Sequence, residues 1–153
     1  MPADLPKWHL AQINIASPLY PTEDSRMAGF MNALEAVNAF AEASPGFVWR
    51  LEDDTGPGAT AHDPFGDGTL INMSVWEDLE SLKAFVYRTG HAAFLRRKAE
   101  WFPKLDKTHM ALWWVPAGTQ PSVADGVAKL ELLHRHGPGA DAFTFGKSFP
   151  APD

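Results

Sequence analysis

The order of strand-like and helix-like segments restricts this fold more than any other feature of the sequence. In the segments 8–16, 46–53, 69–76 and 109–116, apolar residues recur at every second position. That period predicts strands whose side chains alternate between the two faces of a sheet. Apolar residues at spacings of three and four, typical of amphipathic helices, lie between the first and second strands and between the third and fourth.

Both helical segments are bounded by recognisable signals. The first begins among N-cap candidates near residue 24 and stops at the Ser-Pro-Gly of 44–46, and the second begins near Leu79 and continues beyond Gly90 as a further helical segment at 91–102. The order β-α-β-β-α-β is the split-βαβ or ferredoxin-like arrangement. We therefore expect an α+β fold in which four antiparallel strands carry two helices on one face, with a long loop at 55–68.

The C-terminal part predicts one more helix. Ser122 with Asp125 resembles a capping box, and Gly137 with Pro138 gives a stop signal. The residues from 142 onward predict an extended tail. Because a domain holds roughly 150 residues, we expect a single domain over 1–153, with 8–116 as the ferredoxin-like barrel unit and 117–153 as the C-terminal helix and tail.

The sheet face turned away from the two helices is apolar. Ala11, Ile13, Met73, Val75 and Trp113 are among its residues. Such a face is not left open to water. The C-terminal helix can cover part of it, and a second copy of the chain can cover all of it. We therefore expect a homodimer, a dimeric α+β barrel built from two sheets.

Hydrogen-bonding side chains occupy the opposite, helix-facing positions of the strands. Buried polar groups need partners, so these side chains either bond one another or line a cavity that holds a ligand. Mostly apolar walls with a few convergent polar groups are typical of small-molecule sites. Both interpretations are open. In the second interpretation, a ligand cavity, the substrate-binding residues are Gln12, Arg50, Asn72, Ser74 and Phe85.

Charge and cysteine content exclude several classes of protein. The chain has 13 Lys and Arg against 19 Asp and Glu, a formal net charge of −6, and no Cys. Nucleic acids and anionic membranes attract basic proteins, so neither is expected as a partner. Disulfides, zinc fingers and thiol nucleophiles are excluded. Without an apolar run of membrane-spanning length or a signal peptide, we expect a cytoplasmic protein.

A few basic side chains are candidates for chemistry. His91 can act as a general base or ligate haem iron, or it can have a structural role at the start of a helix. Arg96 and Arg97 can bind haem propionates, or they can belong to the solvated face of that helix. His62 and its acidic neighbours match no calcium loop, so no metal site is expected. Phosphate-binding loops and hydrolase motifs do not occur in the sequence.

Several strings in the chain resemble a bacterial family known as a domain of unknown function. They are GFVWRLEDD, TLINMSVWEDLESLKAFVYRTGH, LRRKAEWF, LWWVPAG and the tail AFTFGKSFP, which together extend over nearly the whole chain. That family is similar to the dimeric α+β barrel superfamily, which contains antibiotic-biosynthesis monooxygenases, haem-degrading monooxygenases and non-enzymatic relatives. The resemblance implies the same fold as the order of elements.

The resemblance also implies roles for individual residues. Asn14 matches a position where these monooxygenases often keep a functional Asn, and Trp76 matches a common Trp at the end of the third strand. The haem-degrading branch has a helical Trp and, ten residues later, a His that binds iron. Those positions hold Phe85 and Leu95 here, which weakens the haem-degrading interpretation.

Three functions follow as hypotheses. The first is a monooxygenase-like enzyme, cofactor-independent or haem-dependent, that oxidises an aromatic or polyketide-like small molecule between sheet and helices, with His91, Asn14 and Trp76 as catalytic residues. The second is a haem-binding protein or haem-dependent enzyme in the same pocket, with His91, Arg96 and Arg97 holding the haem. The third is a non-catalytic binding or interaction dimer.

Overall fold

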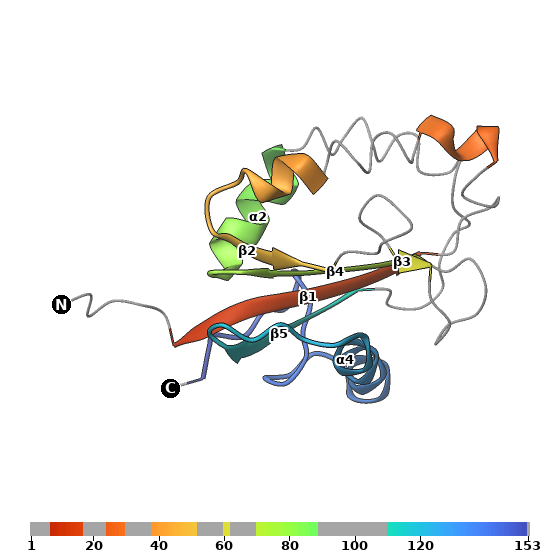
Figure 1. Ribbon diagram of the computed structural model, residues 1–153. Helices are drawn as coiled ribbons and strands as arrows, with labels where there is room; N and C mark the ends of the chain where they lie inside the picture. Colours follow the sequence, from red (N-terminus) through yellow and green to blue (C-terminus); the bar gives the residue numbers. More distant parts are fainter. Residues whose placement is uncertain are drawn as a thin grey trace.

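The computed structural model describes residues 7–16, 24–29, 38–51, 60–61, 70–88 and 110–152. Its strands form one antiparallel sheet in the order β2-β4-β1-β5, with the short β3 paired to β4 (Figure 1). The strands are β1 (Trp8–Ala16), β2 (Phe47–Arg50), β3 (Thr60–Ala61), β4 (Leu70–Trp76) and β5 (Met110–Pro116). The four predicted strands are confirmed, and β3 lies within the segment predicted as a loop.

Helices lie on both sides of this sheet. Helix α2 (Leu79–Arg88) is on one side, beside the helical residues 38–42, and α4 (Val123–His136) is on the other (Figure 1). The 3-10 helix η1 (Ser25–Met27) begins the first predicted helical segment, with Asp24 as its N-cap. The capping box of Ser122 and Asp125 is present. Residues 30–37 and 91–102 of the predicted helical segments lie outside the described residues.

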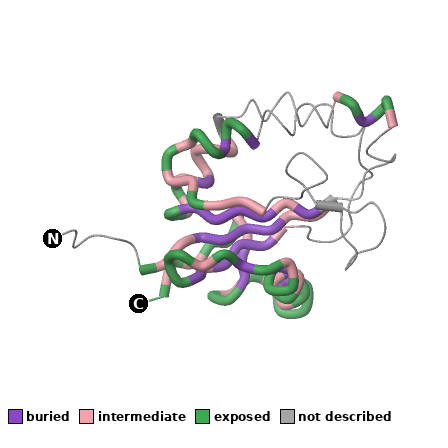
Figure 2. Tube along the Cα trace, in the orientation of Figure 1, coloured by how far each residue is buried: buried purple, intermediate pink, exposed green. Residues whose placement is uncertain are grey.

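The side of the sheet that faces α4 holds a wholly apolar core. Strands β1, β4 and β5 each contribute every second residue, and Leu130 and Leu133 of α4 pack on them. Figure 2 shows buried residues along most of the length of these strands. The side chains buried there are Ala11, Ile13, Ile71, Met73, Val75, Ala111, Trp113 and Val115. This is the face for which we expected a second copy of the chain, and its side chains are already buried within one chain.

The side that faces α2 holds a second core, richer in aromatic rings. Trp76 and Leu10 are fully buried there, and Leu82 and Phe85 of α2 pack on this core. A β-bulge between Phe47 and Trp49 turns their side chains to opposite faces of the sheet. Phe47 therefore joins this core, and Trp49 packs on the core of the other face. The strict alternation of the sequence had placed them together.

The C-terminal tail closes the β5 edge of the sheet. Phe143 forms an antiparallel bridge with Leu112, exchanging backbone hydrogen bonds of 2.8 and 2.9 Å. Trp114 Nε1 donates to the carbonyl oxygen of Phe149 at 2.9 Å. The predicted tail is therefore a paired and partly buried element.

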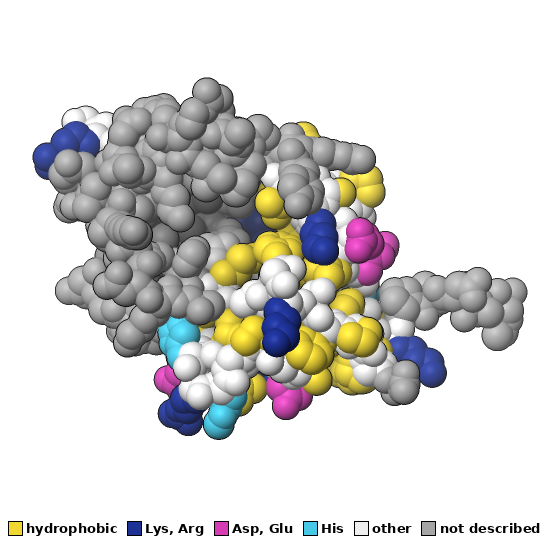
Figure 3. All heavy atoms as spheres, turned by 180° about the vertical axis from the view of Figure 1, so that it is seen from behind, with side chains coloured by type: hydrophobic (Ala, Val, Ile, Leu, Met, Phe, Trp, Pro, Cys, Tyr) yellow, Lys and Arg dark blue, Asp and Glu magenta, His cyan; other side chains and the backbone are white. Residues whose placement is uncertain are grey.

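The described surface carries no dominant charge cluster on the face seen in Figure 3. Its Lys and Arg side chains lie apart from one another, and one of them lies within the central group of hydrophobic side chains. In the part of the chain that the structure describes, no helix has the length and apolar character needed to cross a membrane.

Candidate functional site

Four polar side chains form two neighbouring cross-strand pairs at the centre of the α2-facing side. Gln12 of β1 is opposite Ser74 of β4, and Asn14 is opposite Asn72. Because side chains alternate along a strand, all four point to the same face. We call this group the polar row. The sequence predicted each of these residues for the site, and the structure brings them together.

The polar row is connected by hydrogen bonds. Gln12 Nε2 donates to Asn72 Oδ1 and to Ser74 Oγ, both at 2.8 Å. Asn14 Nδ2 donates to Gln12 Oε1 at 3.2 Å. Gln12 is only 3% exposed and Ser74 8%, whereas Asn14 and Asn72 are half-buried. The network therefore runs from the buried sheet toward a more open end.

Trp76 joins this network to the aromatic core. Its Nε1 donates to Ser74 Oγ at 2.9 Å, and the ring is fully buried. Phe85 of α2 stacks on it at a centroid distance of 5.0 Å, and Phe47 meets it edge-on at 5.4 Å. Trp76 is thus held in one orientation, with its apolar ring toward α2 and its N–H toward the polar row.

Arg50 lies beside the polar row as the β2 partner of Ser74. Its guanidinium forms an ion pair with Glu42 and donates to the carbonyl oxygen of Leu51 at 3.4 Å. Arg50, which the sequence predicted as a site residue, is therefore paired with the carboxylate of Glu42. The sequence contained no signal for Glu42, because this contact spans the turn between the helical residues 38–42 and β2.

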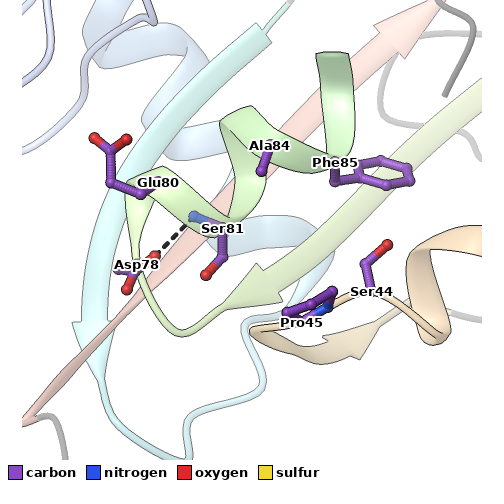
Figure 4. A pocket seen from close by; sticks show the side chains of 7 residues that line it. All are labelled: Ser44, Pro45, Asp78, Glu80, Ser81, Ala84 and Phe85. Atoms are coloured by element: carbon purple, nitrogen blue, oxygen red, sulfur yellow. Dashed lines mark hydrogen bonds between the residues drawn. The ribbon is translucent and has the colours of Figure 1, made fainter. Parts of the chain in front are cut away.

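A shallow hollow opens on the outer side of Phe85. It has a volume of about 250 Å³; four of its residues come from α2, and Asp78 directly precedes that helix (Figure 4). Asp78 Oδ1 accepts from the backbone N–H of Ser81 at 2.8 Å. The lining residues are Ser44, Pro45, Asp78, Glu80, Ser81, Ala84 and Phe85. Phe85 therefore separates the hollow from Trp76, and of this lining the sequence predicted Phe85 alone.

The histidine and arginines predicted to hold a haem, His91, Arg96 and Arg97, lie outside the described residues, so their roles stay predictions. The polar groups of the polar row are amides and a hydroxyl, which are not haem axial ligands of the usual kind. His9 pairs with Val115 on the opposite face. Among the described residues no group of three or more His, Cys, Asp or Glu could hold a metal ion.

Family comparison agrees with this architecture. The model of a family described as a domain of unknown function, DUF3291, matches residues 9–153. The chain belongs to this family, which confirms the resemblance inferred from the sequence. No curated protein matches the chain.

Comparison with solved structures gives matches at low sequence identity, and the match that reaches a TM-score of 0.50 shows the same fold. PA3566 from Pseudomonas aeruginosa has a TM-score of 0.50 at 11% identity, covering 76% of this chain and 100% of that one. SnoaB, a cofactor-independent oxygenase from Streptomyces nogalater, has 0.49 at 16%, covering 74% and 98%. A putative antibiotic biosynthesis monooxygenase from Chloroflexus aurantiacus has 0.42 at 15%, covering 75% and 98%. The predicted α+β fold is confirmed.

Proposed function

We propose that this protein binds an aromatic or polyketide-like small molecule between the sheet and the α2 side and oxidises it as a monooxygenase-like enzyme. The observation that supports this most is the hydrogen-bonded polar row beside a fixed Trp76. Ser74 Oγ accepts two hydrogen bonds, from Gln12 and Trp76, so both of its lone pairs are used and its own O–H is a donor. Such preoriented donors stabilise negative charge that develops on a bound molecule.

For the proposed oxidation the protein needs mainly to orient the substrate and to stabilise the negative charge that develops on it. A substrate with an acidic CH2 group loses one proton to the base, and its carbanion passes one electron to O2. Recombination with the superoxide so formed, and return of the proton, give a hydroperoxide on the same carbon. Loss of water, which takes the second hydrogen of that carbon, leaves a new carbonyl group. Asn72 Nδ2 and the Ser74 O–H stabilise the anionic oxygen of the carbanion, Asn14 helps to orient the substrate, and Trp76 and Phe85 form an aromatic wall. The general base is assigned to His91, as a prediction from the sequence.

Oxygen consumption with anthrone as the probe tests this proposal. One O2 should be consumed per anthrone, which gives anthraquinone and water. We expect the rate to fall at least tenfold in Asn72→Ala and to be unchanged in Gln120→Ala, a control at an exposed loop position. A rate that equals the uncatalysed reaction, or turnover of nitrobenzene in place of anthrone, would refute the proposal.

A non-catalytic binding protein is the second candidate. It is favoured by one observation: in the part of the chain described, every buried side-chain N or O has a hydrogen-bond partner. In that case the polar row is a satisfied part of the core, and ligand binding without oxygen uptake is the expected result. The homodimer is likewise retained as a proposal, to be tested by light scattering.

A further inference from the structure

We infer that Gln12 fixes a hydrogen-bond donor and an acceptor side by side on the polar row. The row would then select a flat ligand edge on which a carbonyl lies next to an N–H or O–H. This inference rests on the ligand-binding part of the proposed function and adds the pattern that the ligand must carry. It assigns Gln12 as a positioning residue and Asn14 and Asn72 as the residues that contact the ligand.

Gln12 is placed to control both asparagines. It is almost completely buried, and both hydrogens of its Nε2 are used, one on Asn72 Oδ1 and one on Ser74 Oγ. Its Oε1 accepts from Asn14 Nδ2. Trp76 Nε1 holds Ser74 Oγ from the other side, so Gln12 cannot turn over without disturbing Ser74 as well. The carboxamide of Gln12 thus has one favoured orientation.

That orientation decides what each asparagine presents. Asn72 uses its oxygen toward Gln12, so its Nδ2 points away with two hydrogens. Asn14 uses its nitrogen toward Gln12, so its Oδ1 points away as an acceptor. Among the described residues none accepts from Asn72 Nδ2 and none donates to Asn14 Oδ1. One asparagine presents a donor and the other an acceptor.

The two groups are close enough to act together. Asn14 and Asn72 are direct cross-strand partners, and the Cβ atoms of such partners lie about 4.5–5.5 Å apart. Both side chains are half-buried, at the open end of the network. A ligand carbonyl can accept from Asn72 while the neighbouring N–H or O–H donates to Asn14. A ligand that lacks the donor leaves Asn14 Oδ1 without a partner and binds more weakly.

The probes are 2-quinolone, which carries this edge as a cyclic amide, and its N-methyl derivative, which lacks the N–H. Isothermal titration calorimetry with the whole chain gives their affinities. We expect 2-quinolone to bind at least tenfold more tightly than N-methyl-2-quinolone. Equal affinities, or no binding of either compound, would overturn the inference.

Two asparagine variants of equal charge give the sharper test. Asn72→Asp can still accept from Gln12 but has no donor for the ligand, so 2-quinolone affinity should fall at least tenfold. Asn14→Asp keeps an acceptor for the ligand but loses the hydrogen bond from Asn14 Nδ2 to Gln12 Oε1. Gln12 stays held by its two bonds to Asn72 and Ser74, so the preference for 2-quinolone over its N-methyl derivative should persist. The reverse pattern, or an equal loss in both variants, contradicts the orientation assigned to Gln12.

Gln12→Glu tests the positioning role itself. A carboxylate cannot donate to Asn72, so Asn72 should turn its amide and the preference for 2-quinolone should disappear. Gln120→Glu adds the same charge at an exposed position and should leave it unchanged. Preserved selectivity in a folded Gln12→Glu protein would overturn the positioning role of Gln12. If Gln12→Glu does not fold, the Asn72→Asp and Asn14→Asp variants provide the test. Because 2-quinolone has no acidic CH2 to oxidise, its selective binding together with failure of oxygen uptake would refute only the proposed oxidation.

Discussion

The two faces of this sheet are built from the same strands and differ sharply in chemistry. The α4-facing side carries only apolar side chains in its buried core. The α2-facing side combines aromatic rings with the polar row, and Gln12 and Ser74 are almost fully buried there. Adjacent residues of β4 lie in the two environments, because Met73 points to the α4-facing side and Ser74 to the α2-facing side.

Under the proposed function, this difference assigns stability to one face and ligand binding to the other. Burial of apolar surface stabilises a fold in proportion to its area, and hydrogen bonds among buried polar groups contribute much less. A sheet that needed only stability would carry apolar residues on both faces. Under the proposed function the polar row serves recognition on one face, and the other face is expected to supply most of the stability.

The largest effect is expected from substitutions of Met73 and Ser74, which are adjacent on β4 and point to opposite faces. Met73→Ala removes a fully buried side chain and should lower the free energy of unfolding by about 2–5 kcal/mol. Ser74→Ala leaves Trp76 Nε1 and one hydrogen of Gln12 Nε2 without their acceptor, at a cost of about 1–3 kcal/mol. Urea denaturation measures both. A larger loss in Ser74→Ala would reverse the assignment of the two faces.

The contact between α4 and the sheet is tested at Gly126. A Cβ there would lie 2.6 Å from Ile13 Cδ1, so Gly126→Ala should force the two apart and cost about 1–3 kcal/mol. Gly139→Ala is the matched control, because a Cβ at that position meets nothing within 4 Å. Equal stability of the two variants would show that α4 does not pack tightly on β1.

The start of α4 gives a smaller effect on the same face. Ser122 Oγ accepts from the backbone N–H of Asp125 at 3.1 Å, and Asp125 Oδ2 accepts from the N–H of Ser122 at 2.9 Å. Ser122→Ala removes the first of these bonds and should cost about 1 kcal/mol. Thermal unfolding should show a lower midpoint, and the 2-quinolone affinity measured on the other face should not change.

The smallest effect is expected away from both faces, at Asp24. Hydrogen bonds from the Arg26 side chain and backbone N–H hold the pKa of Asp24 at about 2, below its ordinary value of 3.8. A lowered folded-state pKa stabilises the fold above the ordinary pKa, and this contribution is lost as the pH falls from about 4 to 2. NMR titration of the Asp24 carboxyl carbon should show it, and Arg26→Gln should raise the pKa. An unchanged pKa in that variant would contradict the cause.

Much of the fold is predictable from the sequence because apolar periodicity is a local signal. The bounds of β1 agree with the alternation, and Ser122 with Asp125 gave the start of α4. The bulge in β2 was not predictable, because the extra residue is fixed by pairing with β4 rather than by local composition. The side of the sheet that α4 covers also depends on tertiary packing, so the sequence left it open between this helix and a second copy.

The residues of the candidate site could be predicted from the sequence, but the hydrogen bonds among them could not. Alternation placed Gln12, Asn14, Asn72 and Ser74 on one face, which the register confirms. Which nitrogen donates to which oxygen depends on side-chain packing across strands some sixty residues apart in sequence. The ion pair of Arg50 with Glu42 and the hollow beside α2 depend equally on tertiary contacts.

The central position of β1 has a consequence for the order of events during synthesis. Its residues pair with β4 about 60 residues later in the chain and with β5 about 100 residues later. A ribosome that adds 5–20 residues per second takes roughly 5–20 s to produce the second of these partners. Strand β1 therefore leaves the ribosome before both of its partners and waits with both edges unpaired. Such long-range pairing slows folding, and chaperone contact with the nascent chain should be concentrated on this N-terminal strand.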